Sequence, residues 1–191
     1  MNRIALYASL LAGMAIQANA DSWRPIASIG YDAGGEKLGT VFFADGTREH
    51  VHANQGLHLA GGVAIPLLSG LQLQSTLGFQ TAGSSGDNGE MTWQSFPWET
   101  TLAAQLGNVT IGGGVIYHLS PEFTTHGALA NLGNFRFEDT LGYQAQIAWS
   151  PASRSQSGQY QLGVRYSAVE FTLNDTTING DSTGLFLKYL F

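Results

Sequence analysis

Two residues of the chain have the types and the spacing of a catalytic pair. His118 and Ser120 are separated by one residue, so a β-strand would project both side chains from one face. A serine hydroxyl acts as a nucleophile when a base lies within hydrogen-bond reach, and imidazole is a common base. Glu122 and Glu138 follow as candidates for orienting the imidazole. The pattern predicts nucleophilic catalysis, although a motif of two residues is short.

A second histidine pair has the spacing of metal ligands. His50 and His52 also share a strand face, with Glu49 and His58 nearby in the sequence, and imidazole binds zinc, nickel or copper. The H-x-H pattern supplies only two ligands, and a solvated loop strand is the alternative explanation. We therefore expect no bound metal and no other cofactor. Because the chain has no cysteine, a thiolate metal site and a disulfide are excluded.

Charged residues also occur on the polar faces of alternating segments, namely Arg24, Glu99, Arg165 and Lys188. If those faces line the inside of a barrel, the charges are buried and must be paired to be tolerated. We therefore predict that Glu99 lies near Arg165 or Lys188 across the lumen. Such a network would either plug the barrel or form an ion-conducting gate, and the narrow interior of a small barrel favours the plug.

Strands must position these residues, and alternation of apolar with other residues recurs along the chain. In the clearest case, leucines at 71, 73 and 77 alternate with polar residues at 72, 74 and 76. We expect an all-β fold whose eight strands cover about 23–31, 56–66, 71–80, 92–106, 109–120, 137–150, 159–173 and 183–191.

The expected connections alternate in length. Those near residue 68, at 107–108 and at 151–158 are shorter on average than those at 32–55, 83–91, 121–136 and 174–181. The first long loop contains a hairpin signal around Asp45-Gly46, and counting it as wall would give ten strands, which the polar segment 50–54 disfavours. Acidic residues should make the long loops a solvated cap that could also bind divalent cations: Asp32, Glu36, Asp45, Glu49, Asp87, Glu90, Glu122, Asp175 and Asp181.

The last nine residues carry a wholly apolar strand face, formed by Leu185, Leu187, Tyr189 and Phe191. An exposed apolar edge promotes aggregation, whereas a barrel that closes its last strand onto its first has no edge. Aromatic residues towards the ends of other outward faces would anchor such a barrel at the membrane interfaces. The tail therefore predicts a closed barrel in a membrane.

The start of the chain has the pattern of a secretory signal. Residues 1–20 combine Arg3, a short apolar segment at 4–16 and an Ala18-Asn19-Ala20 cleavage site, which leaves 21–191 as one domain. No stretch reaches the ~20 apolar residues of a membrane-spanning helix. Lys and Arg number 8 against 14 Asp and Glu, and this net charge of −6 disfavours nucleic acid as a partner.

Together, the signal segment, eight alternating strands, unequal loops and terminal Phe191 resemble the small bacterial outer-membrane proteins of the OmpA, OmpX and OmpW kind. The resemblance implies an eight-stranded antiparallel up-and-down transmembrane β-barrel in the outer membrane. It also implies that the barrel-assembly machinery reads the tail. The surroundings would be membrane lipid and lipopolysaccharide, and we expect a monomer.

Three functions follow from this architecture. The first is a structural or surface-interaction role in the envelope. The second is a narrow channel or carrier for small solutes, suggested by small interior residues: Gly62, Ala64, Gly112, Gly114 and Ala148. The third is an enzyme, because outer-membrane lipid A deacylases are similar in using a His-x-Ser pair with a Glu, here His118, Ser120 and Glu138. Alternation turns this pair into the lumen, away from lipid, so we expect no enzyme activity.

Overall fold

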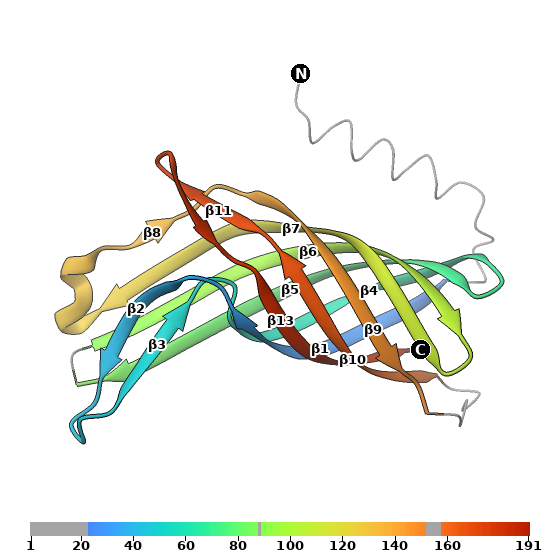
Figure 1. Ribbon diagram of the computed structural model, residues 1–191, viewed down its shortest axis with the longest axis horizontal. Helices are drawn as coiled ribbons and strands as arrows, with labels where there is room; N and C mark the ends of the chain where they lie inside the picture. The colour runs from blue at the N-terminus through green and yellow to red at the C-terminus, as the bar shows by residue number, and fades with distance from the viewer. Residues whose placement is uncertain (1–22, 88, 152–157) are drawn as a thin grey trace.

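Eight antiparallel strands close into a barrel in the computed structural model, which describes residues 23–87, 89–151 and 158–191 (Figure 1). The expected signal segment, 1–20, lies outside these ranges. In ring order the strands are β1 (Arg24–Gly34), β4 (Gly56–Leu68), β5 (Leu71–Gly86), β6 (Gly89–Leu106), β7 (Val109–His126), β9 (Thr140–Trp149), β10 (Gln159–Ala168) and β13 (Ser182–Leu190). The predicted eight-stranded up-and-down barrel is confirmed.

The ring closes between the first and the last strand. β13 pairs antiparallel with β1 along its whole length, with Leu187 opposite Ile29, and with β10 on its other side. Each wall strand therefore has a hydrogen-bonded neighbour on both sides, which leaves no sheet edge within the wall. Within the described ranges, none of the helical segments is long and apolar enough to span a membrane.

Through most of its height the wall has an apolar outer face and a polar inner face. On β10 and β13, Leu162 and Leu185 are 57% and 66% exposed, whereas Gln161 and Lys188 are buried. Every second residue points outward because side chains of a strand alternate between its faces. Large leucines on the outside and glutamines on the inside are the reverse of a water-soluble barrel.

The two faces exchange polarity near the N-terminal end of β6, the end away from the short turns. From Phe96 onward the outward side chains are apolar, as at Trp98, and the inward ones are polar, as at Glu99. Before Phe96, Gln94 faces outward and Trp93 is fully buried inside, and the β6–β7 register shifts between Gln94 and Phe96. From Phe96 to the end of β6 there are about ten residue steps, or ~33 Å of strand. At a tilt of ~45° this crosses ~23 Å, which matches the ~25 Å apolar belt of an outer-membrane barrel.

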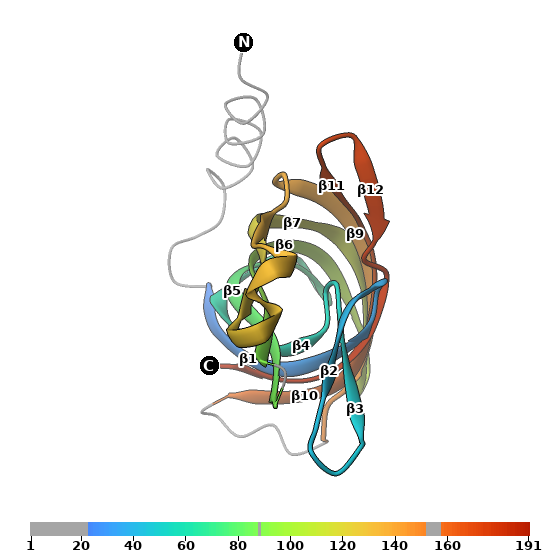
Figure 2. The ribbon, with the colours of Figure 1, turned by 90° about the vertical axis from the view of Figure 1, so that its left-hand side faces the viewer.

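Beyond this level β5, β6 and β7 continue as one side of a second structural region, which we call the outer lobe (Figure 2). Two hairpins, β2 (Lys37–Phe42) with β3 (Arg48–His52) and β11 (Glu170–Leu173) with β12 (Thr176–Asn179), form other sides. A short 3-10 helix (Gly127–Leu132) and β8 (Phe135–Arg136) follow β7. The lobe has an apolar core of Val41, Val51, Ala53, Met91, Trp93, Phe123, Phe137, Val169 and Phe171.

Several strand ends differ from the prediction, and most of these differences lie where strands continue towards or into the outer lobe. β1 continues past the expected loop start and includes Asp32, and β7 continues to His126 through the expected loop 121–136. The expected strand 159–173 is divided at Val169, β9 begins only at Thr140, and the expected loop 174–181 contains β12. Beyond the membrane the alternation continues, but the outward positions become polar and the inward positions become apolar. A strand prediction that requires apolar outward positions therefore stops too early.

Candidate functional site

The candidate site is a charge network in the half of the lumen nearer the outer lobe, and it is centred on Arg165 of β10. Its guanidinium donates to both carboxylate oxygens of Asp32 on β1, from Nη2 to Oδ2 at 2.7 Å and from Nε to Oδ1 at 3.3 Å. Nη1 donates to the Glu99 carboxylate on β6, on another side of the ring. All three residues are less than 10% exposed. One planar guanidinium therefore bridges two carboxylates across the barrel.

His58 on β4 also contacts Arg165. Its Nδ1 lies 3.2 Å from Arg165 Nη2, and because arginine only donates, Nδ1 accepts this bond. The proton of the neutral ring then resides on Nε2, which lies 3.6 Å from Glu99 Oε1. The imidazole thus lies between the guanidinium and the second carboxylate, and its hydrogen bond is to the guanidinium. Strands β1, β4, β6 and β10 all contribute to one network.

A chain of neutral groups extends the network towards the outer lobe. Gln80 donates to Asp32 Oδ2 at 3.2 Å and to the Asn54 carbonyl at 3.1 Å. Ser95 donates to Gln80 Oε1 and lies 3.2 Å from Nδ1 of His118, whose ring packs edge-on against Phe171. The polar lumen therefore connects directly to the apolar core of the lobe.

Lys188 of β13 lies in the lumen nearer to the short turns. Its ammonium donates to Gln74 at 2.6 Å and to Gln146 at 3.4 Å, and it lies 5.1 Å from the centre of the Phe186 ring. Two carboxylates, one guanidinium and one ammonium group are thus buried in the lumen together, which balances their formal charge.

Apolar layers border this polar layer at both ends. At the end with the short turns, Ile26, Ala64 and Leu190 form a small buried cluster. At the other end lies the core of the outer lobe, in which Trp93 contacts Phe171 with ring centres 5.0 Å apart. Side chains fill the lumen in the way expected of an eight-stranded barrel.

Of the four charges expected in the lumen, the structure brings Arg165 and Glu99 together, places Lys188 in a lower layer and separates Arg24. Arg24 lies at the short-turn mouth, where its Nε and Nη2 donate to the carbonyls of Phe191 and Leu190 at 2.9 Å. The expectation that Arg24 belongs to the central network is therefore wrong, because it is the first residue of β1 and lies at the end of the wall.

Sequence reasoning misses Asp32, which it places among the solvated acidic residues of the loops. It is 2% exposed and binds Arg165. The alternation of β1 contained the signal, since Ser28, Gly30 and Asp32 share the inward face.

The proposed catalytic pair is not assembled as a dyad in the described structure. His118 is fully buried beside Ser95, while the Ser120 hydroxyl accepts a hydrogen bond from Arg136 at 2.9 Å. Ser120 has a positive φ of 48° at the point where β7 changes register, so its side chain leaves the face of His118. Glu138 is exposed, and its backbone amide donates to Thr172. The group that contacts the Ser120 hydroxyl is therefore the Arg136 guanidinium and not the His118 imidazole.

The other histidine pair lies on β3 in the outer lobe. His50 Nδ1 lies 2.9 Å from the Thr40 hydroxyl, and His52 Nδ1 donates to the Gly35 carbonyl at 2.9 Å. Both histidines therefore have partners from their own lobe. In residues 23–87, 89–151 and 158–191, no group of three or more His, Cys, Asp or Glu side chains is placed to hold a metal ion.

The tail residues proposed as an assembly signal form the outer face of β13. Leu185, Leu187 and Phe191 are 66%, 44% and 56% exposed on that face. Near the short-turn mouth, Tyr189 packs against Tyr160 and Phe191, with ring centres 4.6 and 4.7 Å apart. This aromatic group marks one interface of the apolar belt.

A closed wall with an apolar belt outside and a filled, charge-balanced polar lumen inside matches one environment, the hydrocarbon of a membrane. The protein is an outer-membrane β-barrel. Barrels of this kind usually have their short turns in the periplasm and their longer loops outside the cell.

Comparison with solved structures agrees with this fold. Neisserial surface protein A superposes with a TM-score of 0.53 at 9% identity, over 88% of this chain and 94% of its own. Ail, the attachment invasion locus protein of Yersinia pestis, superposes with a TM-score of 0.53 at 12% identity, over 89% of this chain and 99% of its own. No family model and no curated protein matches the sequence. The comparisons therefore support the fold of this outer-membrane barrel and leave its role to the site.

Proposed function

We propose that the protein is a sealed anchor in the outer membrane, which presents its outer lobe for a structural or surface-interaction role. The observation that carries this proposal is the Asp32–Arg165–Glu99 bridge, which crosses the lumen between two apolar layers. Moving an ion past it would require either the separation of a buried ion pair or the passage of a charge through apolar side chains, and both are costly.

The small interior residues, which suggested a channel, have another role in the wall. A Cβ added at Gly62 would collide with the backbone of β5 at Ser75, and one at Gly114 would collide with β6 at Thr100. These glycines allow neighbouring strands to approach closely, so they do not by themselves indicate a passage. This supports the sealed anchor over a channel or carrier.

Conductance in planar bilayers tests the seal. We expect no discrete steps from purified, refolded protein at concentrations where a general porin, inserted in the same bilayer, gives them. Steps that persist in preparations free of other porins and vanish after heat unfolding would overturn the proposal.

Presentation of the lobe outside the cell has a separate test. Lys37 and Arg48 are exposed on the β2–β3 hairpin and are trypsin sites. Trypsin added to intact cells should cut this hairpin, as shown by mass spectrometry of the released or nicked chain. Cleavage that appears only after the cells are permeabilised would contradict the orientation.

The absence of enzyme activity is also part of the proposal, because Ser120 contacts Arg136 and not His118. The lipid A of cells that express the wild-type protein or Ser120→Ala should have the same acylation by mass spectrometry. Loss of an acyl chain with wild type alone would instead support the hydrolase.

A further inference from the structure

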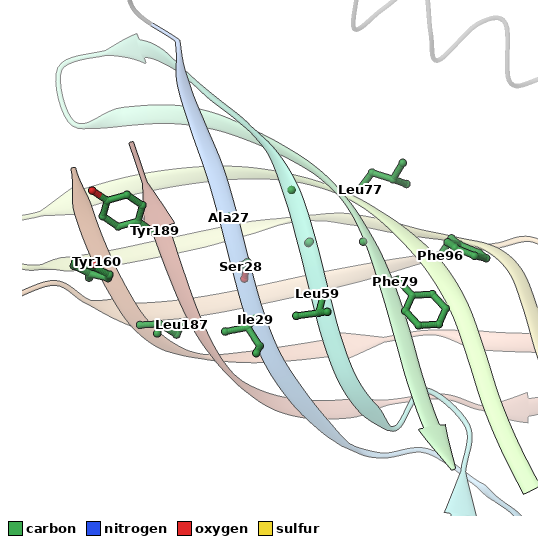
Figure 3. A pocket seen from close by; sticks show the side chains of 13 residues that line it. Ala27, Ser28, Ile29, Leu59, Leu77, Phe79, Phe96, Tyr160, Leu187 and Tyr189 are labelled. Carbon is green, nitrogen blue, oxygen red and sulfur yellow. The ribbon is translucent and has the colours of Figure 1, made fainter. Parts of the chain in front are cut away.

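The lipid-facing wall contains a hollow of about 650 Å³ over strands β13, β1, β4 and β5 (Figure 3). Its lining is almost entirely apolar and includes Ala27, Ile29, Leu59, Gly61, Leu77 and Leu187. This volume is within the range of ~300 to 1,000 Å³ typical of small-molecule sites. The hollow differs from the rest of the belt, where leucines and aromatic residues project.

Strand register creates the hollow. Ala27 on β1 pairs with Gly61 on β4, and this pair lies between Tyr189 on β13 and Leu77 on β5. All four positions face outward because they are paired positions of adjacent strands. Two of the smallest side chains therefore lie side by side between two large ones, which leaves a floor of backbone and a rim of large side chains.

Neither the backbone nor crowding within the barrel requires glycine at position 61. A Cβ built there would meet only the Ile26 carbonyl, at 3.9 Å, and Gly61 is not among the glycines with positive φ. At the next residue, Gly62, an added Cβ would instead collide with β5. The space outside Gly61 is thus free for a molecule other than this chain.

We propose that this hollow binds one acyl chain of a phospholipid from the periplasmic leaflet. It lies within the apolar belt, where hydrocarbon is the surrounding medium. Tyr160 and Tyr189 border it at the short-turn end, with ring centres 4.6 Å apart, and tyrosine prefers the interface between hydrocarbon and headgroups. A chain entering there belongs to the periplasmic leaflet.

A second copy of the barrel is a poorer occupant than an acyl chain. A twofold dimer whose axis passes through the hollow would place two hollows face to face and double the unfilled volume. A flexible chain can follow the curved floor between the rims. Packing attraction is the driving force, because burial of apolar surface gains little within hydrocarbon.

Native mass spectrometry of barrels reconstituted with phospholipid alone tests the proposal. Gly61→Leu fills the hollow, and Gly113→Leu is the matched control, because Gly113 is also exposed, an added Cβ there meets only the Gln144 carbonyl at 3.8 Å, and it lies outside the hollow. We expect wild type and Gly113→Leu to retain one phospholipid each. Retention by Gly61→Leu should fall about tenfold, equivalent to ~1.4 kcal/mol.

Ala27→Leu is a second filling variant and should behave as Gly61→Leu does, and heat-dependent migration on gels identifies folded protein for each variant. Equal retention by folded Gly61→Leu, folded Ala27→Leu and wild type would overturn the proposal. Equal loss in the Gly113→Leu control would do so too. When lipopolysaccharide is added in equal amount, the retained molecule should still be phospholipid. Displacement of the phospholipid by lipopolysaccharide would place the hollow in the outer leaflet and would overturn the proposal.

Discussion

Replacing Arg165 with methionine should strongly destabilise the barrel. The substitution keeps much of the side-chain volume and removes the only group seen to donate to both Asp32 and Glu99 in the described structure. Both carboxylates would then lie in a closed lumen without their cation, together with His58. The unpaired charges, and not a cavity, are the expected cause of the loss.

The magnitude follows from the number of bonds and their burial. Arg165 makes three hydrogen bonds to the oxygens of two carboxylates, and Arg165, Asp32 and Glu99 are each less than 10% exposed. A hydrogen bond to a charged group contributes ~1.5 to 3 kcal/mol, and breaking a buried pair by removing one partner costs ~3 to 5 kcal/mol. Because two carboxylates lose one shared partner, we expect a loss at the upper end, ~4 to 5 kcal/mol.

The assay is reversible urea unfolding in phospholipid vesicles, followed by tryptophan fluorescence, with the free energy of unfolding extrapolated to water. The triple variant Asp32→Asn, Glu99→Gln, Arg165→Met removes all three charges and should recover most of the loss, because neutral side chains tolerate burial better. A loss below ~1 kcal/mol for Arg165→Met, or no recovery in the triple variant, would refute the reasoning.

Three further predictions concern the outer lobe and the tail. Trp93→Ala should cost the lobe ~3 to 5 kcal/mol and accelerate its proteolysis while the barrel still shifts on gels, whereas Phe42→Ala, half exposed, should have little effect. The Thr47 hydroxyl and amide both donate to the Asp45 carboxylate and hold its pKa below the ordinary value, so Thr47→Val should raise this pKa towards that value in an NMR titration. The stabilisation from this depressed pKa is present above the ordinary value and disappears as the pH falls through the folded-state pKa. Phe191→Ala should lower the folded yield in cells but leave refolding in detergent unchanged, because the ring is 56% exposed; equal yields in cells would contradict a role in assembly.

The membrane wall could be predicted from the sequence because each strand there follows one simple rule. Outward positions such as Leu185 and Leu162 must be apolar in hydrocarbon, and inward positions such as Gln161 must be polar or small. The period of two is a local property of strands, so it can be read without knowing which strands are neighbours.

The outer lobe follows the same period with opposite polarity, so the rule for the membrane wall predicts loops there. Trp93 and Met91 lie on the inward face of β6, where the rule for the membrane wall expects polar residues. Their apolar partners, such as Val51 and Phe171, come from two hairpins that are distant from β6 in the sequence. A solvated cap was the expectation, and the structure shows a polar surface over an apolar core.

The sequence by itself determined the period of the strands, the side that most residues of the membrane wall face, and hence the kind of medium on each side of that wall. Only the tertiary structure decided which inward charges meet. Arg165 and Asp32 are 133 residues apart and become partners because the ring closes through β13, while Arg24, on the same face as Asp32, remains at the mouth. The same closure and register place Ala27 beside Gly61 and create the hollow. The side of the wall on which a side chain lies is set by the alternation along its own strand. Which side chains become neighbours is set by strand order and register around the closed ring.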